Sequence, residues 1–391
     1  MQTYEYYKNG GRYNIIEAFN QQGDRIASMD ASKNKKQLKQ NIMANKVKFN
    51  ECLSVIPDAL IWAEDQDVEG LKKFFIEDAQ KPLYCIASGG SVSPIDYAAL
   101  LYESKRGMAK VLTPLSMASV SDEALQTAKI LIMCSSGKGC DEKYAAKRAS
   151  KTNPRSTCAI VKNVGDENAV VNYLKKADSR WFAYDWLTHD KSFIATIDTI
   201  CKFGLIYNAF SDTNSFPLYQ LTIDISPKYC FYYGPRVEGK VPKLQDIKNY
   251  IVLYNGWSRP VAVDFESKMV ESGIASVQLC DFRNYCHGRF IFTSKHIEDT
   301  ALVLFITPRE QQFVKDLIWG ITWRDKTDVF PKNLPILKVE TEYDSPLATI
   351  DLLVKAYVLF DEIAKVNNEE PCSPSNPCKI DKRFPKNTPF K

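Results

Sequence analysis

Long apolar runs and a signal peptide are absent from the sequence, and each absence excludes a class of protein. No stretch of the 391 residues approaches 18 consecutive apolar residues, so we expect no transmembrane helix and no membrane partner. The N-terminus, MQTYEYYKNGG, lacks the basic segment followed by an apolar segment that a secretory signal peptide has. We therefore expect a cytoplasmic protein.

An excess of charge of either sign is also missing. The sequence has 51 basic and 47 acidic residues and a formal net charge of +4. It thus gives no reason to expect nucleic acid as a partner, and it leaves anionic small molecules open. At 45% hydrophobic and 25% charged, the composition is typical of a soluble globular protein. A chain of this length fits two domains.

Histidine is scarce, and the cysteines follow no metal-binding pattern. Only His189, His287 and His296 occur, and the positions of Cys280 and Cys286 relative to the last two match no zinc motif. We therefore expect no metal site. The 11 cysteines are scattered through apolar segments, which is typical of buried free thiols rather than of a disulfide framework. The chain also lacks a Walker A sequence and a G-x-G-x-x-G sequence, and we expect no cofactor.

Apolar segments of strand length alternate with helical patterns in two rounds. The first round has apolar segments at 83–87, 109–112, 129–133 and 157–161, and the second has them at 250–254, 275–279, 301–307 and 335–339. In each round this alternation predicts right-handed crossovers and a parallel sheet covered by helices on both faces. The expected fold class is therefore α/β, with two three-layer α/β/α domains.

The expected domain boundaries follow from the same alternation. They are an N-terminal appendage of mixed helix and loop (1–60), a first domain (61–225), an aromatic and proline-rich connector (226–245), a second domain (246–366) and a polar tail (367–391). Composition alone predicts that such a tail is disordered.

Two turns rich in glycine and serine follow strands of the first domain. They are ASGGS at 87–91 and SSGKG at 135–139. Ligands of an open parallel sheet bind beyond the carboxyl ends of its strands, and N–H groups and hydroxyls there favour an anion such as phosphate. The alternative is that both are ordinary strand-to-helix turns. For the anion site we select Ser88, Gly90, Ser91, Ser135, Ser136 and Lys138.

A helix predicted near the start of the second domain carries three ionisable residues on one face. The spacing of Asp264, Lys268 and Glu271 places them together, and His287 follows sixteen residues after Glu271. A carboxylate, an ammonium and an imidazole could carry out proton transfer. Spacing alone favours the simpler alternative, an exposed ion pair between Lys268 and Glu271.

Three segments together resemble the double SIS (sugar isomerase) family, which includes the isomerase half of glucosamine-6-phosphate synthase. They are CIASGGS (85–91), IMCSSGKGCDEKYAAKRA (132–149) and the segment at 255–289, which contains PVAVDFESKMVE and YCHGR. The interval of sixteen residues between the glutamate and the histidine is the same as in the family. The resemblance covers about 60–365 and implies two flavodoxin-like domains that bind a sugar phosphate.

The resemblance also implies a role for each residue that matches the family's motifs. Glu271 matches the glutamate that moves a proton between C1 and C2 of the sugar through an enediol(amine). Lys268 matches a lysine that assists the developing oxyanion. His287 matches a ring-opening histidine that comes from the neighbouring subunit, which implies a homodimer. The polar tail would then be an ordered lid.

The sequence departs from the family pattern at several positions. Cys134 and Gly139 stand where the phosphate loop has hydroxyl residues, so two donors are lost. Asn284 and Asp264 stand where the family has glutamate. None of the tail lysines, Lys379, Lys382, Lys386 and Lys391, aligns securely with the family's Schiff-base lysine.

These features leave three hypotheses. The first is a phosphosugar aldose–ketose isomerase or deaminase-like enzyme. The second is a regulator that binds a sugar phosphate or a nucleotide-sugar without turnover. The third is a protein whose ligand is a phosphoribosyl or nucleoside compound, with the histidine loop acting on its ribose. Because position 2 is Gln2 where a glutamine amidotransferase domain needs its cysteine, we expect no glutamine-driven glucosamine synthesis.

Overall fold

The computed structural model describes residues 48–163, 168–187, 192–212, 215–221, 244–322 and 334–375, together with the backbone of three N-terminal strands. These strands are β1 (Thr3–Asn9), β2 (Arg12–Phe19) and β3 (Arg25–Asp30), and they form an antiparallel sheet in that order. The expectation of mixed helix and loop for this part of the chain is therefore wrong. His189 and the four tail lysines lie outside the described residues.

The first α/β unit contains a parallel sheet of five strands in the order β5-β4-β6-β7-β8. The strands are β4 (Leu83–Ile86), β5 (Ala109–Leu112), β6 (Lys129–Cys134), β7 (Thr157–Lys162) and β8 (Arg180–Tyr184). Every residue of the central strand β6 is buried, which explains why its sequence, KILIMC, is apolar almost throughout.

Helices cover both faces of this sheet, as the alternation of apolar residues requires. Leu131 and Met133 of β6 pack into a core with α4 (Glu69–Ile76), α5 (Val92–Lys105) and α10 (Ile197–Phe210). Ile130 and Ile132 point the other way, because neighbouring residues of a strand face opposite sides of the sheet. The helices on that second face are α6 (Pro114–Met117), α7 (Asp122–Thr127), α8 (Cys140–Thr152) and α9 (Ala169–Lys176).

The second α/β unit contains a parallel sheet of four strands in the order β10-β9-β11-β12. The strands are β9 (Asn249–Tyr254), β10 (Ser276–Asp281), β11 (Thr300–Ile306) and β12 (Ile336–Glu340). One face packs against α11 (Arg259–Glu271) and α15 (Leu347–Val366), and the other against α12 (Phe282–Asn284) and α14 (Gln311–Thr322). Two parallel sheets, each covered on both faces, confirm the α/β class.

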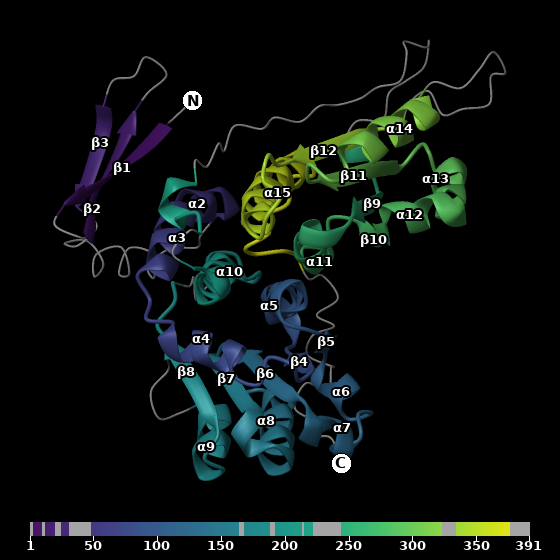
Figure 1. Cartoon of the computed structure of the whole chain (residues 1–391). Helices are drawn as coiled ribbons and strands as arrows, with labels where there is room; N and C mark the ends of the chain where they lie inside the picture. Colours follow the sequence, from purple (N-terminus) through teal and green to yellow (C-terminus); the bar gives the residue numbers. More distant parts are fainter. Residues whose placement is uncertain are drawn as a thin grey trace.

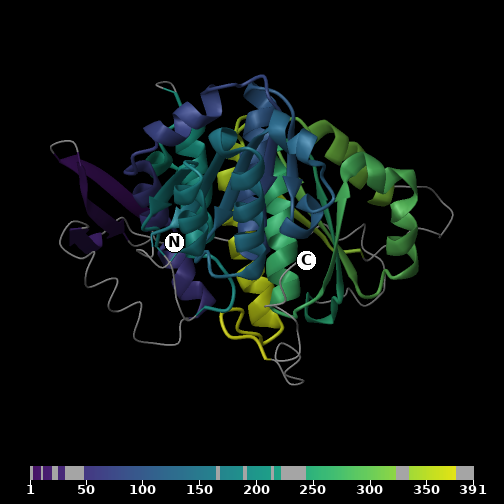
Figure 2. The same cartoon turned by 90° about the horizontal axis from the view of Figure 1, so that it is seen from below.

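A single apolar core joins the two units. Figures 1 and 2 show α5 and α10 of the first unit facing α11 and α15 of the second, between the two sheets. Two helices that precede the first sheet, α2 (Phe49–Ser54) and α3 (Ile56–Glu64), also pack into this core. The Arg259 guanidinium of α11 forms an ion pair with Asp96 of α5, with 3.0 Å between Nη2 and Oδ1. No helix among the described residues is long and apolar enough to cross a membrane.

The described start of the polar tail packs against this core. Cys372 is buried, and its carbonyl accepts a hydrogen bond of 2.8 Å from the Phe193 amide. The Glu370 carboxylate accepts from the Phe49 amide of α2 at 3.0 Å. Residues 367–375 are therefore ordered by contacts with α2 and with the segment before α10, against the disorder that composition predicts.

Candidate functional site

The two serine- and glycine-rich turns lie side by side at the carboxyl edge of the first sheet. The first turn, a short 3-10 helix (Gly89–Ser91), joins β4 to α5, and the second, residues 135–139, joins β6 to α8. Because β4 and β6 are hydrogen-bonded neighbours in a parallel sheet, both turns emerge at the same edge. The sequence predicted that each turn follows a strand, whereas the pairing of β4 with β6 comes from the structure.

One lysine that the sequence analysis did not select joins the two turns. The Lys202 ammonium of α10 lies 3.2 Å from Ser91 Oγ and 3.1 Å from Ser135 Oγ. It also pairs with Asp198 Oδ2 at 3.1 Å and lies 5.1 Å from the centre of the Trp186 ring. Its side chain is only 1% exposed. We define Ser91, Ser135, Asp198 and Lys202 as the Lys202 cluster.

A sequence signal for this lysine exists in α10. The helix reads IDTICKFGLIYNAF, in which Lys202 is the one basic residue and Asp198 lies four positions before it. A lysine within a strongly apolar helix is seldom fully buried unless it has a partner, and the spacing of four residues provides one. The pattern indicates a buried ion pair, but it does not indicate which turns the pair reaches.

The second turn has a conformation that only glycine provides easily. Gly137 has a φ of 62°, and a Cβ built on it would collide with the amide of Asn168. Asn168 in turn caps α9 by accepting hydrogen bonds from the amides of Val170 and Val171. Gly137 therefore lets the loop lie directly against the start of α9.

The remaining predicted residues of the anion site lie around the same edge. Ser136 and Lys138 are exposed, and Ser88 is half-buried. Gly90 packs closely against the segment before α10, since a Cβ on it would lie 3.0 Å from Ala195 Cβ. These four residues line the turns, whereas the hydrogen bonds of the Lys202 ammonium go to Ser91, Ser135 and Asp198.

Both family departures in the second turn have structural consequences. Cys134 is buried, and burial raises the pKa of its thiol to about 12, so it stays neutral at pH 7. The Gly139 amide donates to Glu142 Oε2 at 3.1 Å, so a carboxylate of α8 already occupies that donor. The turn thus offers an anion fewer donors than the SIS pattern that it resembles.

In the second unit, the turns that follow β9 and β11 both donate hydrogen bonds to the carboxylate of Glu310. Glu310 is 5% exposed and accepts hydrogen bonds from the Thr307 amide at 3.0 Å and from Asn255 Nδ2 at 3.1 Å. The Thr307 hydroxyl also donates to Glu310. An incoming anion would meet a buried negative charge at this edge. The first unit, where a buried ammonium joins the turns, is therefore the better candidate for an anion site.

The three ionisable residues of α11 separate into a buried pair and an exposed glutamate. Lys268 Nζ pairs with Asp264 Oδ2 at 2.8 Å, and both side chains are buried. Ser93 of α5 donates to Asp264 Oδ1 at 2.7 Å, and the ammonium lies 4.9 Å from the centre of the Tyr357 ring. The exposed ion pair that spacing favoured does not form, because the partner of Lys268 is Asp264.

Glu271 is the last residue of α11 and faces solvent. Its carboxylate accepts a hydrogen bond from Ser267 Oγ at 2.7 Å. His287 lies in an exposed turn between α12 and α13 (Phe290–Lys295). Among the interactions of the described residues, none connects Glu271, Lys268 and His287 to one another within this single chain.

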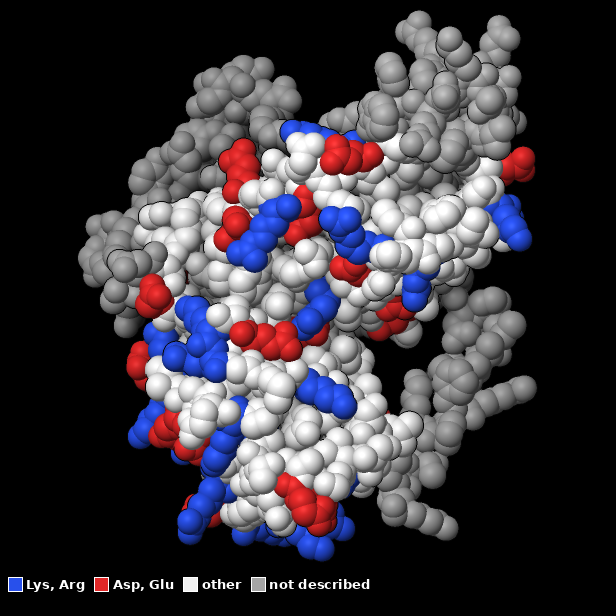
Figure 3. Space-filling view, turned by 45° about the vertical axis from the view of Figure 1, so that its right-hand side comes forward, with Lys and Arg blue, Asp and Glu red and all other residues white. Residues whose placement is uncertain are grey.

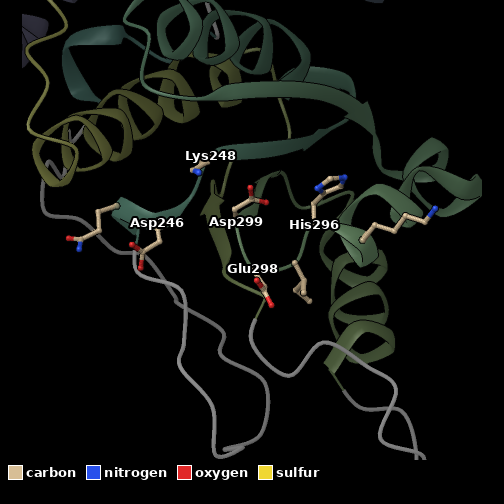
Figure 4. Close-up of a pocket in the computed structure, with 8 residues that line it drawn as sticks. Asp246, Lys248, His296, Glu298 and Asp299 are labelled. Carbon is tan, nitrogen blue, oxygen red and sulfur yellow. The ribbon is translucent and has the colours of Figure 1, made fainter.

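The described residues also form pockets away from the turns, and basic side chains that include Lys129, Arg155 and Arg180 line one of them. Two pockets lie at the amino ends of the strands, one around Lys129 and one around Lys248, His296 and Asp299 (Figure 4). Ligands of parallel sheets bind at the opposite edge, and for this reason we place the site at the turns. On the face in Figure 3, acidic and basic side chains are intermixed. The described residues contain no group of three side chains suited to a metal ion.

Comparison with known proteins finds solved structures of similar fold. No protein-family model and no curated protein sequence matches the chain. Tagatose-6-phosphate ketose/aldose isomerase from Escherichia coli is similar in structure, with a TM-score of 0.57, 15% identity, and coverage of 85% of this chain and 97% of that chain.

Two further solved structures show the same likeness. Glucosamine-6-phosphate deaminase from Thermotoga maritima has a TM-score of 0.55 and 14% identity, and the match covers 84% of this chain and 98% of that chain. The C-terminal domain of glucosamine-fructose-6-phosphate aminotransferase from Francisella tularensis has a TM-score of 0.55 and 14% identity, with 84% and 99% covered. The chain therefore has the α/β fold of SIS-type proteins that are named for reactions on sugar phosphates.

Proposed function

We propose that the protein is an enzyme that binds a sugar phosphate and isomerises it, or deaminates it, by proton transfer between C1 and C2. The observation that carries this proposal is the convergence of both turns on the buried Lys202 ammonium at the carboxyl edge of the first sheet. The fold likeness to proteins named as sugar-phosphate isomerases and deaminases supports it. So does the interval between Glu271 and His287.

In the proposed reaction the turns hold the phosphate and Glu271 handles the proton. The Glu271 carboxylate removes the proton from C2 of the open-chain sugar. The electron pair of that C–H bond forms the C1–C2 double bond, and the π pair of the C1 carbonyl moves to O1. The same carboxyl group then returns the proton to C1, while the O2 hydroxyl proton passes to O1 and the C2 carbonyl forms. In deamination the same transfer leaves a C2 imine, which water hydrolyses with release of ammonia. We assign to Lys268 the stabilisation of the developing oxyanion, and its pair with Asp264 holds the ammonium in position.

We further propose that His287 opens the sugar ring and belongs to the site of a neighbouring copy in a homodimer. This assignment fits its exposed position, since it contacts neither Glu271 nor Lys268 within the described part of one chain. Mixing Glu271→Gln with His287→Ala tests it. If each site takes one residue from each subunit, the mixture regains up to about a quarter of the wild-type activity. A mixture as inactive as its components would contradict a shared site.

One observation favours a second candidate, a binding regulator without turnover. The hydroxyl donors lost at positions 134 and 139 are the ones that a family enzyme uses to hold its substrate, and Gly139 already donates to Glu142. A regulator would bind a sugar phosphate tightly and leave its C2 proton untouched.

The exchange of the C2 proton in deuterated water separates the two candidates. A panel of hexose and pentose phosphates is incubated with wild type, with Glu271→Gln and with Glu123→Gln, an exposed control on α7. An enzyme incorporates deuterium at C2 for at least one sugar. Glu271→Gln loses the exchange by about 100-fold or more, and Glu123→Gln keeps it. If a sugar phosphate binds saturably and no sugar of the panel shows exchange, the protein is a binding regulator rather than an enzyme.

A further inference from the structure

The first unit contains a buried charge pair that touches both turns of the anion site. Lys202 donates to Ser91 and Ser135, and Asp198 accepts from Lys202. The corresponding place in the second unit holds the Glu310 carboxylate. The two units therefore differ at the carboxyl edges of their sheets, because the first has an ammonium paired with a carboxylate and the second has a carboxylate without an ammonium among its described partners.

The direction of these hydrogen bonds leaves the serine hydroxyls available to an anion. An ammonium has only donors, so the oxygens of Ser91 and Ser135 act as acceptors toward it. Each hydroxyl hydrogen then remains free to donate away from Lys202. An anion seated on the turns would receive two hydroxyl donors with the ammonium directly behind them.

Asp198 balances the ammonium in the ligand-free cluster. The two side chains are 1% and 13% exposed, so a lysine without this partner would be a buried, uncompensated charge. A bound anion competes with Asp198 for the same ammonium. A dianion competes better than a monoanion, because its attraction to the ammonium is stronger.

We propose that Lys202 is the cation that selects a phosphate monoester in this site, in place of the hydroxyl donors absent at Cys134 and Gly139, and that Asp198 is its internal competitor. The inference rests on the proposed function in one respect, the identity of the ligand as a sugar phosphate. It adds a specificity residue that lies on α10, outside both turns.

Calorimetric titration with fructose 6-phosphate and with inorganic phosphate tests the inference. The variants are Lys202→Met, Asp198→Asn, and Lys147→Met as a control that removes one exposed lysine from α8. Lys202→Met weakens the binding of fructose 6-phosphate about 10- to 100-fold, as expected for the loss of a hydrogen bond to a charged group. Asp198→Asn strengthens it several-fold, and Lys147→Met leaves it unchanged.

Asp198→Asn is the decisive variant, because a purely structural ion pair would give the opposite sign. Thermal unfolding of each variant shows whether it is folded, and if Lys202→Met does not fold, Asp198→Asn alone decides. Weaker or unchanged binding by folded Asp198→Asn would overturn the inference. So would wild-type affinity in Lys202→Met, or no binding of either probe to wild type at millimolar concentration.

The C2 exchange assay separates failure of this inference from failure of the proposed enzyme. Exchange in wild type together with unchanged binding by Lys202→Met would reject Lys202 and leave the isomerase standing. If the variants bind fructose 6-phosphate in the predicted order but wild type shows no exchange, the role of Lys202 in binding is supported and the isomerase is rejected.

Discussion

Gly137 is the residue on which the shape of the second turn depends. Its φ of 62° disfavours any residue with a Cβ, and the Asn168 amide occupies the space that the Cβ would need. We expect Gly137→Ala to destabilise the fold by about 2 kcal/mol or more and to weaken phosphate binding.

Gly107→Ala is the matched control for this substitution. Gly107 has no positive φ, and a Cβ on it would meet the Ala79 carbonyl oxygen at 3.7 Å, an ordinary contact. Chemical denaturation should show a change within about 0.5 kcal/mol for Gly107→Ala. Equal effects of the two substitutions would show that the second turn does not need its positive φ.

At the residue scale, the sequence predicts the turns better than the charge that joins them. Ser91 and Ser135 could be selected because their turns directly follow apolar strands, and chain order determines where such turns emerge. Lys202 lies more than sixty residues beyond the second turn. The local pattern of α10 indicates that Lys202 is buried, but which turns it reaches depends on how α10 packs against α5 and α3, and no local pattern contains that packing.

At the scale of elements, α10 and α3 approach each other at a glycine. A Cβ on Gly204 would lie 2.6 Å from Ala63 Cβ, so the two helices must separate to accept one. We expect Gly204→Ala to reduce the free energy of unfolding by about 1–3 kcal/mol, although alanine is the better helix former. The same shift of α10 would displace Lys202 and weaken phosphate binding.

Gly320→Ala in α14 provides the control with the opposite sign. Among the described residues, no atom apart from its chain neighbours and the nearby backbone of its own helix lies within 4 Å of a Cβ built there, so alanine gains helix propensity without a collision. We expect an increase of about 0.5–1 kcal/mol in the free energy of unfolding, measured by denaturant titration. A stabilising Gly204→Ala would contradict the close helix contact.

The helix α11 shows what the spacing of residues can predict about side-chain contacts and what it cannot. Asp264, Lys268 and Glu271 were predicted to share one face, and the first two do form a pair. Glu271 differs in burial because it ends the helix, beyond the region where the buried Lys268 faces Tyr357 of α15. The spacing of residues predicts on which side of a helix a side chain lies. Whether that side chain is buried also depends on whether a neighbouring helix covers that turn of the helix.

At the scale of the whole molecule, the two α/β units share one apolar core. Leu131 of the first sheet and Val303 of the second belong to the same cluster, with α5, α10, α11 and α15 between them. We therefore expect one cooperative unfolding transition, because neither unit can unfold without exposing the inner face of the other. Calorimetry and circular dichroism should give coincident midpoints. Two separated transitions would show that the units are independent domains.

The alternation of strands and helices was sufficient to predict two parallel sheets, because it follows from hydrophobic periodicity along the chain. The shared core was not predictable in the same way. Apolar residues on the outer face of a helix do not reveal whether they meet the same unit, the other unit or another chain.

A crystal structure of the protein with bound fructose 6-phosphate would show where the sugar phosphate binds. We expect the phosphate to lie against the two turns, within hydrogen-bond distance of Ser91 or Ser135 and beside Lys202. We also expect C2 of the sugar to point toward Glu271. A phosphate bound instead in the pocket around Lys248 and Asp299, with the turns unoccupied, would show that the turns are not the substrate site.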